Sequence, residues 1–196
     1  MSFTDMADVP DGLTTDTFVL RPITADDAEI DYAAVMESRE FLRKWEQSSW
    51  PEDDFTVEAN RKDLEGLEKR HDARSTFTYT VIDAAGTRCL GCVYIVPTDS
   101  RMFASATISA VDGRQWNDYD AVVYFWVRKS ELAARTDRTL LDELRRWLSH
   151  EWTFTRTLFV TNEEFTQQVN MIEETDLRLC FTIAEPGNSG KGRAYA

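Results

Sequence analysis

The most strongly patterned part of the chain runs from Ala121 to Trp152. Its first section, Val122 to Val127, is an unbroken apolar run rich in β-branched and aromatic residues, which predicts a strand buried on both faces of a sheet. In the second section, apolar residues recur every three or four positions, which predicts an amphipathic helix. These residues are Leu140, Leu141, Leu144, Trp147, Leu148 and Trp152. We therefore predict a central strand followed by a helix that packs on its sheet and buries Leu144 and Leu148.

Shorter apolar runs predict further strands on both sides of this unit. They lie at residues 17–21, 76–82, 89–96, 157–161 and 178–184. The turn Ala84-Ala85-Gly86 joins the second and third of these runs as a hairpin. Between residues 97 and 120, TISAV alone predicts a strand, and DGRQWNDYD is typical of turns.

Capping residues and apolar stripes predict three more helices. Thr24 is placed to cap a helix that ends near Ser38, Thr56 to cap a surface helix, and a further helix follows at 162–175. The segment between the first two contains Pro51 and four large aromatic residues without clear periodicity, so we predict a loop. Its aromatic residues are either core contacts or part of a substrate wall.

The alternation of strands and helices predicts one α/β domain over residues 17–184, a size that buries a sufficient core. We expect residues 1–16 to be a flexible arm, because they are polar and contain Pro10 and Gly12. The Gly-rich residues 185–196 are expected to be a flexible tail.

The charge of the chain limits its partners. Thirty-five acidic residues against 22 basic ones give a net charge of −13, which argues against duplex DNA or an anionic membrane as the partner. A cationic partner is favoured, and an acidic surface that serves solubility is the alternative. No apolar run approaches the ~20 residues of a membrane span, and the first residues lack a signal-peptide pattern. We expect a cytoplasmic protein with no nucleic-acid or membrane partner, and leave a homodimer open.

The cysteines do not predict a metal site. Cys89 and Cys92 form a CxxC motif inside a strand-like run, where residues three apart point to opposite faces. We therefore interpret them as core residues and expect no bound metal.

The order of the predicted elements, with FVLRPITADDA near the start and VVYFWV in the middle, resembles the GNAT superfamily of acetyl-CoA-dependent N-acyltransferases. The resemblance covers about residues 17–184 and implies a mostly antiparallel twisted central sheet with helices on both faces. It also implies transfer of an acetyl or related acyl group from coenzyme A, the co-substrate, to an amine of a small molecule or a protein. The acidic surface suits a cationic amine.

The resemblance implies a coenzyme A site at the end of the central strand. In that superfamily the strand backbone binds the pantetheine arm, and a Gly-rich loop presents amides to the pyrophosphate at the next helix N-terminus. Carried over to this chain, the residues that bind the co-substrate are Phe125, Trp126, Val127, Arg128, Arg135, Thr136, Arg138, Thr139 and Asn162.

Both glycine positions of that loop are changed here, to Arg135 and Asp137. The good helix formers from Glu131 to Arg135 predict a helical segment rather than an extended phosphate cradle. Basic side chains, Lys129 included, offer a clamp for phosphate in place of amides, and a solvated helix start of mixed charge is the alternative. Asn162 either contacts the co-substrate or caps the following helix.

No catalytic residue can be assigned from the sequence. The position that often holds a glutamate base in the superfamily is Val122, and the tyrosine that often protonates the leaving thiolate is absent. The remaining candidates for a general base are Glu52, Asp53, Asp54, Asp118 and Asp120.

Two functions follow from these departures. The first is an N-acyltransferase, because positioning alone supplies much of the rate in this chemistry. The second is a catalytically inactive GNAT-fold binding or assembly module, which the combined losses favour. An enzyme requires an open cleft beside Phe125 to Val127, whereas in a module Trp126, Trp50 or the 97–120 segment would fill it.

Overall fold

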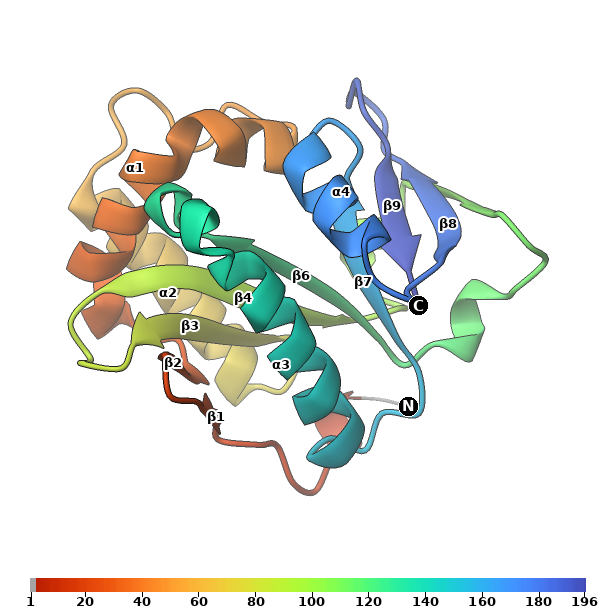
Figure 1. The fold of residues 1–196 in the computed structure, drawn as a ribbon, viewed down its shortest axis with the longest axis horizontal. Helices are drawn as coiled ribbons and strands as arrows, with labels where there is room; N and C mark the ends of the chain where they lie inside the picture. Colours follow the sequence, from red (N-terminus) through yellow and green to blue (C-terminus); the bar gives the residue numbers. More distant parts are fainter. Residues whose placement is uncertain (1–2) are drawn as a thin grey trace.

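A computed structural model describes residues 3–196, which form one twisted sheet with helices on both faces (Figure 1). The strands are β1 Leu13–Thr14, β2 Phe18–Pro22, β3 Phe77–Asp83, β4 Cys89–Pro97, β5 Thr107–Ala110, β6 Ala121–Val127, β7 Thr157–Asn162, β8 Leu179–Ala184 and β9 Gly192–Tyr195. Their order across the sheet is β1-β2-β3-β4-β6-β7-β9-β8-β5. Among these strands, β6 and β7 are parallel and every other neighbouring pair is antiparallel. The predicted α/β class and mostly antiparallel sheet are confirmed.

Within the described part of the chain, four α-helices cover the sheet. They are α1 Ala28–Glu46, α2 Val57–Asp72, α3 Thr136–His150 and α4 Thr166–Glu173. Figure 1 shows α3 and α4 in front of the sheet and α2 behind it. Within residues 3–196, no helix combines the length and the apolar character that a membrane crossing requires.

The predicted central unit is confirmed. Strand β6 lies between β4 and β7, and Leu144 and Leu148 of α3 are 0% and 2% exposed. Alternate residues of β6 serve two cores, since Phe125 packs with α3 and Trp126 packs with α1. This double burial explains why the strand is apolar without interruption.

Helix α1 is two turns longer than the sequence predicted, because it continues past Ser38 to Glu46. The buried stripe of the helix passes through Val35, Ser38 and Leu42, so a polar residue interrupts the apolar pattern. The Ser38 hydroxyl is buried and accepts a hydrogen bond from the backbone N–H of Lys129, 3.0 Å away. Trp45, expected in a loop, therefore lies on a helix.

A β-bulge changes the prediction for the cysteines. Val81 of β3 pairs with Gly91 and Ile82 pairs with Cys89, so Leu90 is the extra residue on β4. Cys89 and Cys92 consequently face the same apolar cluster, not opposite faces as predicted. At this bulge Gly91 lies so close to β6 that a Cβ atom there would come within 2.1 Å of the Trp126 carbonyl oxygen.

Both chain ends contribute to the fold where the sequence indicated flexible segments. In the N-terminal arm, Phe3 and Met6 are buried against the core and β1 pairs with β2, while residues 1–2 lie outside the described part. In the tail, β9 inserts between β7 and β8, with Ala194 and Tyr195 buried. The short alternation of β9 was hidden by the glycines and polar residues around it.

A carboxyl group is buried between α1, α2 and β4. Asp31 is 3% exposed, and it accepts hydrogen bonds from Asn60 Nδ2 at 2.9 Å and from the Cys89 thiol at 3.7 Å. Burial, which disfavours the charged form, raises the pKa of Asp31 to about 6. Since the folded state holds this proton more tightly than the unfolded chain, the free energy of unfolding falls as pH rises from about 4 to about 6.

We expect Asp31→Asn to stabilise the protein at pH 7.5 by roughly 1 to 3 kcal/mol, because it removes a buried negative charge and keeps the shape of the side chain. Near pH 4 the two proteins should be almost equally stable. Urea unfolding across this pH range measures the difference in stability. Glu151→Gln is the control, because it removes one carboxylate from the surface. A stability difference that does not change with pH would contradict this account.

Candidate functional site

The site is built where the parallel strands β6 and β7 separate. Their pairing covers Ala121 with Thr157, Val122 with Leu158 and Val123 with Phe159, and the strands diverge beyond these residues. Gln168 of α4 reaches into the gap and donates a hydrogen bond from Nε2 to the carbonyl oxygen of Phe125, 3.0 Å away. At this point the Gln168 side chain replaces the backbone hydrogen bonds that β6 and β7 no longer make with each other.

Two further polar atoms are buried near this gap. Gln168 Oε1 and Thr161 Oγ1 have no hydrogen-bond partner within residues 3–196, and both side chains are at most 2% exposed. Phe125 and Thr161 each follow the last strand pair by two residues, so they lie at the same level on either side of the gap. Because unpaired buried polar atoms are costly, this place suits a ligand with an amide or carbonyl group.

A cleft of about 1020 Å³ meets the sheet at the same separation. Tyr124 of β6 and Val160 to Asn162 of β7 form part of its floor. Large aromatic side chains from two other elements, Trp45 of α1 and Tyr94 of β4, and Trp50 from the loop after α1 also line it. The cleft is open beside Tyr124, whereas Phe125, Trp126 and Val127 are buried.

The cleft carries carboxylates that sequence patterns did not identify. Glu46, Asp63 and Glu185 line it, together with the basic side chains of Lys62 and Arg70. Glu46 accepts a hydrogen bond from the Ser48 hydroxyl at 2.9 Å. Desolvation of its carboxyl group by the surrounding atoms raises its pKa above the usual range, although the residue as a whole is exposed. Glu46 escaped notice because the helix that carries it was predicted to end at Ser38.

The segment after β6 is helical, as predicted. Lys129–Ala134 forms a 3-10 helix, and Arg135 then takes a left-handed conformation with φ of 57° before α3 begins. A glycine adopts this conformation at little cost, whereas a residue with a side chain is disfavoured. Arg135 thus keeps the backbone shape of a glycine position without the glycine.

Two carboxylates of the chain itself accept hydrogen bonds from the residues between β6 and the first turn of α3. Glu37 of α1 accepts hydrogen bonds from the Ser130 backbone N–H at 3.0 Å and from Arg128 Nε at 2.6 Å. These contacts lower the pKa of Glu37 below its usual range. Asp137, 3% exposed in the first turn of α3, accepts from the Arg138 N–H at 2.9 Å and from Gln167 of α4.

The other residues proposed for the co-substrate are also held by the chain. Arg128 pairs with Glu37, Arg135 with Glu174 and Arg138 with Asp142, while Thr136 and Thr139 donate to Glu131 and to the Arg135 carbonyl. The pairs of Arg135 and Arg138 are partly exposed, and such pairs contribute little stability. These two arginines can therefore exchange partners at small cost.

Asn162 makes a capping hydrogen bond, and its contact with the co-substrate stays a prediction. Its Oδ1 accepts a hydrogen bond from the Glu164 backbone N–H at 2.9 Å, so it caps the turn before α4. It also lines the cleft. The five carboxylates considered as bases lie elsewhere: Asp53 pairs with Arg43, Asp120 accepts from the Thr155 and Arg156 amides, and neither these two nor Glu52, Asp54 and Asp118 line the cleft.

Within residues 3–196, no group of three or more His, Cys, Asp or Glu side chains is arranged to hold a metal ion. The three cysteines are free and buried.

No family model matches the chain, and no curated protein matches it. Solved structures do match. The microcin C7 self-immunity acetyltransferase MccE, in complex with acetyl-CoA and AMP, has a TM-score of 0.70 at 12% identity over 95% of this chain and 96% of its own. RimL, the ribosomal L7/L12 alpha-N-protein acetyltransferase, has a TM-score of 0.68 at 12% identity over 93% and 91%.

A third similar structure, the ribosomal-protein-S5-alanine acetyltransferase from Vibrio fischeri, has a TM-score of 0.60 at 14% identity over 96% of this chain and 95% of its own. The chain has the GNAT fold. Two of the similar structures are described as complexes: MccE with acetyl-CoA, and a second RimL structure with coenzyme A.

The residues of this chain fit the pantetheine arm of coenzyme A better than its pyrophosphate. Within this GNAT fold, the gap between β6 and β7 offers buried polar atoms that suit the amides of a pantetheine arm. The segment before α3 presents the carboxylates of Glu37 and Asp137 where a pyrophosphate would need positive charge. Donor binding at this end therefore requires these carboxylates to be outweighed by Arg128, Arg135 and Arg138.

Proposed function

We propose that the protein is an N-acyltransferase that moves an acetyl or related acyl group from coenzyme A to an amine. The observation that carries this proposal is the meeting of the open cleft with the gap between β6 and β7 at Tyr124 and Val160. An acyl donor in the gap would place its thioester at the floor of the cleft. An acceptor amine in the cleft could then attack it directly.

The donor would lie along the backbone of Phe125, Trp126 and Val127, with Gln168 and Thr161 paired to its arm. Its phosphates would take Arg135 and Arg138 from their carboxylates and contact the first turn of α3 at Thr136 and Thr139. Asn162 would face the same region from β7. Because the carboxylates of Glu37 and Asp137 would lie beside the phosphates and repel them, we expect weak binding of coenzyme A.

The acceptor is a cationic amine, either a small molecule or the amine of a protein. The cleft carries aromatic faces and three carboxylates, which together attract a cation. RimL and the Vibrio fischeri enzyme are described as acetyltransferases of ribosomal proteins, which supports a protein amine as one class of acceptor.

In the reaction, the cationic amine first loses one proton to solvent. The neutral amine then attacks the thioester carbonyl carbon, the new C–N bond forms, and the C–S bond breaks to release the thiolate. A second proton must leave the amine nitrogen as the amide forms. Glu46 is placed in the cleft to accept it, and its raised pKa makes it a stronger base than an ordinary carboxylate. The proton can return through solvent to the thiolate, which completes the balance.

The second candidate is a GNAT-fold binding or assembly module that does not acylate. The observation that favours it is that Glu37 and Asp137 already accept hydrogen bonds from the backbone N–H groups between β6 and α3, where a phosphate would have to bind. In such a protein the cleft would bind a cationic partner and release it unchanged.

Binding of acetyl-CoA separates the two candidates. We expect a thermal shift with acetyl-CoA for the native chain and a larger one for Asp137→Gly, which removes a negative charge beside the phosphates and frees the backbone. Replacing Arg135 and Arg138 together by Ala should weaken binding by about 1 to 3 kcal/mol, because charged hydrogen bonds at partly exposed sites are lost.

Calorimetry measures these affinities, and Arg70→Ala is the matched control because it removes a cation on the acceptor side. If neither the native chain nor Asp137→Gly gives heat or a thermal shift at millimolar acetyl-CoA, the module is the correct function.

A second prediction concerns the base. Glu46→Gln should lower kcat by about 100-fold or more with acetyl-CoA and a polyamine or a short basic peptide, while the affinity for acetyl-CoA stays unchanged. The rise of kcat/KM with pH that reflects Glu46 should also disappear. Release of free thiol measures the rate, and Glu52→Gln, a neighbouring carboxylate outside the cleft, should retain activity. Equal rates for the native chain and Glu46→Gln would show that Glu46 is not the base.

A further inference from the structure

A second cavity, of about 500 Å³, lies at the opposite end of β6 and β7 from the acyl-transfer cleft. Tyr119 precedes β6 and Arg156 precedes β7, where the two strands are still paired. Arg114 enters from the segment after β5 and Arg145 from α3. The cavity is therefore separate from the cleft beside Tyr124.

The charge of this cavity is opposite to that of the chain. Three arginines line it, Arg114, Arg145 and Arg156, although the chain carries a net charge of −13. No Asp or Glu side chain is among the lining residues, which also include Ala196, the last residue of the sequence. The acidic partners of the arginines lie outside the lining and are exposed: the side chains of Asp112, Asp118 and Asp176 are 43%, 54% and 77% exposed. Exposed pairs of this kind are weak, so a bound anion can compete with them.

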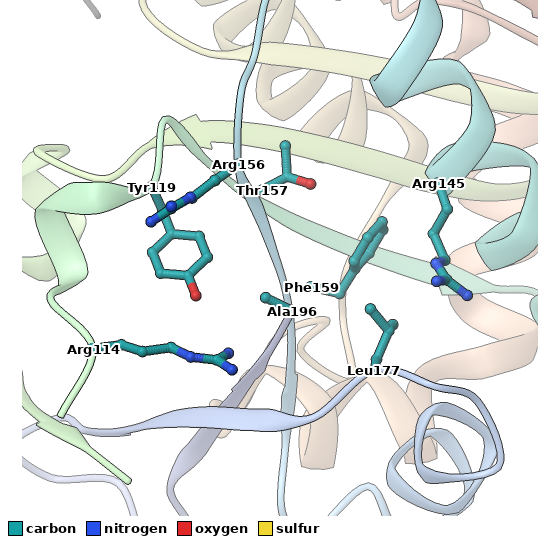
Figure 2. A pocket seen from close by; sticks show the side chains of 8 residues that line it. All are labelled: Arg114, Tyr119, Arg145, Arg156, Thr157, Phe159, Leu177 and Ala196. Carbon is teal, nitrogen blue, oxygen red and sulfur yellow. The ribbon is translucent and has the colours of Figure 1, made fainter. Parts of the chain in front are cut away.

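Two of these guanidinium groups have N–H donors without a strong hydrogen-bond acceptor. Arg114 Nη1 donates to the sulfur of Cys180, which is a weak acceptor. Arg156 Nη1 lies 4.0 Å from Asp118, which is beyond hydrogen-bond distance. Figure 2 shows the Arg114 guanidinium and the Tyr119 hydroxyl on one side of the cavity.

The remaining wall is apolar. Phe159 and Leu177 are 3% and 9% exposed, and Figure 2 shows them between the Arg114 side of the cavity and Arg145. An anion held by Arg114 and Arg156 would thus have apolar side chains beside it. Guanidinium groups suit phosphate oxygens, and a phosphate monoester carries close to two negative charges at neutral pH.

We propose that this cavity binds a small organic phosphate monoester. Arg114, Arg156 and the Tyr119 hydroxyl hold the phosphate, and the organic group rests on Phe159 and Leu177. Arg145 contributes from the far side. The site has no part in acyl transfer.

Calorimetry with phenyl phosphate tests this site at low ionic strength and pH 7.5, without acetyl-CoA. We expect binding that is tighter for phenyl phosphate than for inorganic phosphate, because the ring gains apolar contact, and tighter than for benzoate, which carries one charge. Arg156→Gln should weaken phenyl phosphate binding about tenfold, and Arg114→Gln at least as much. Arg146→Gln removes the same charge one position from Arg145 on α3, outside this cavity, and should leave the affinity within about twofold.

Several results would overturn the proposal. Absence of heat with millimolar phenyl phosphate would show that no such site exists. An equal loss in Arg146→Gln and Arg156→Gln would reduce the binding to general charge attraction. Equal affinity for benzoate would show a carboxylate site instead. Arg156→Gln decides the matter even if Arg114→Gln fails to fold, because Arg156 is largely exposed and its side chain makes no hydrogen bond within residues 3–196. The outcome is independent of whether the protein acylates.

Discussion

Three residue pairs between the parallel strands β6 and β7 hold the two halves of the sheet together. The strands to one side of them are joined by antiparallel ladders, and so are those to the other side. Beyond Val123 the pairing stops, and a side chain from α4 crosses the gap instead. The position of this short parallel contact fixes where the cleft meets the sheet, and it also separates the cleft from the Arg-lined cavity at the other end of the same strands.

The segment between β6 and α3 shows how an acidic chain keeps a loop geometry that usually needs glycine. Arg135 takes the left-handed conformation. Glu37 and Asp137 accept hydrogen bonds from backbone N–H groups that could otherwise bind the oxygens of an external phosphate. The contacts of Glu37 also tie α1 to the end of β6. Binding of a phosphate at this segment would therefore be a competition between internal and external anions, and its balance would depend on a few partly exposed ion pairs.

The sequence predicted the elements whose apolar pattern is uninterrupted, which include β6, α3 and the hairpin of β3 and β4. It failed where the pattern was broken for a structural reason. Ser38 interrupts the stripe of α1, so the last two turns and Glu46 were missed, and one extra residue at Leu90 turned Cys89 to the face of Cys92. The contacts of Glu37 with residues 128 and 130 span more than ninety positions. Local periodicity carries no information on such contacts.

The insertion of β9 has a consequence for the order of folding. Strands β8 and β5 are linked to the rest of the sheet through residues 192–195, which must enter between β7 and β8 after both have been synthesised. The pairing of β9 with β8 is local, but its pairing with β7 is not and forms more slowly, because the longer loop between these partners must close before any contact is gained. Until then β7 has an unpaired edge beside an apolar core, and such an edge is prone to pair with another chain. Pairing of β9 with β7 therefore removes this edge as well as completing the sheet.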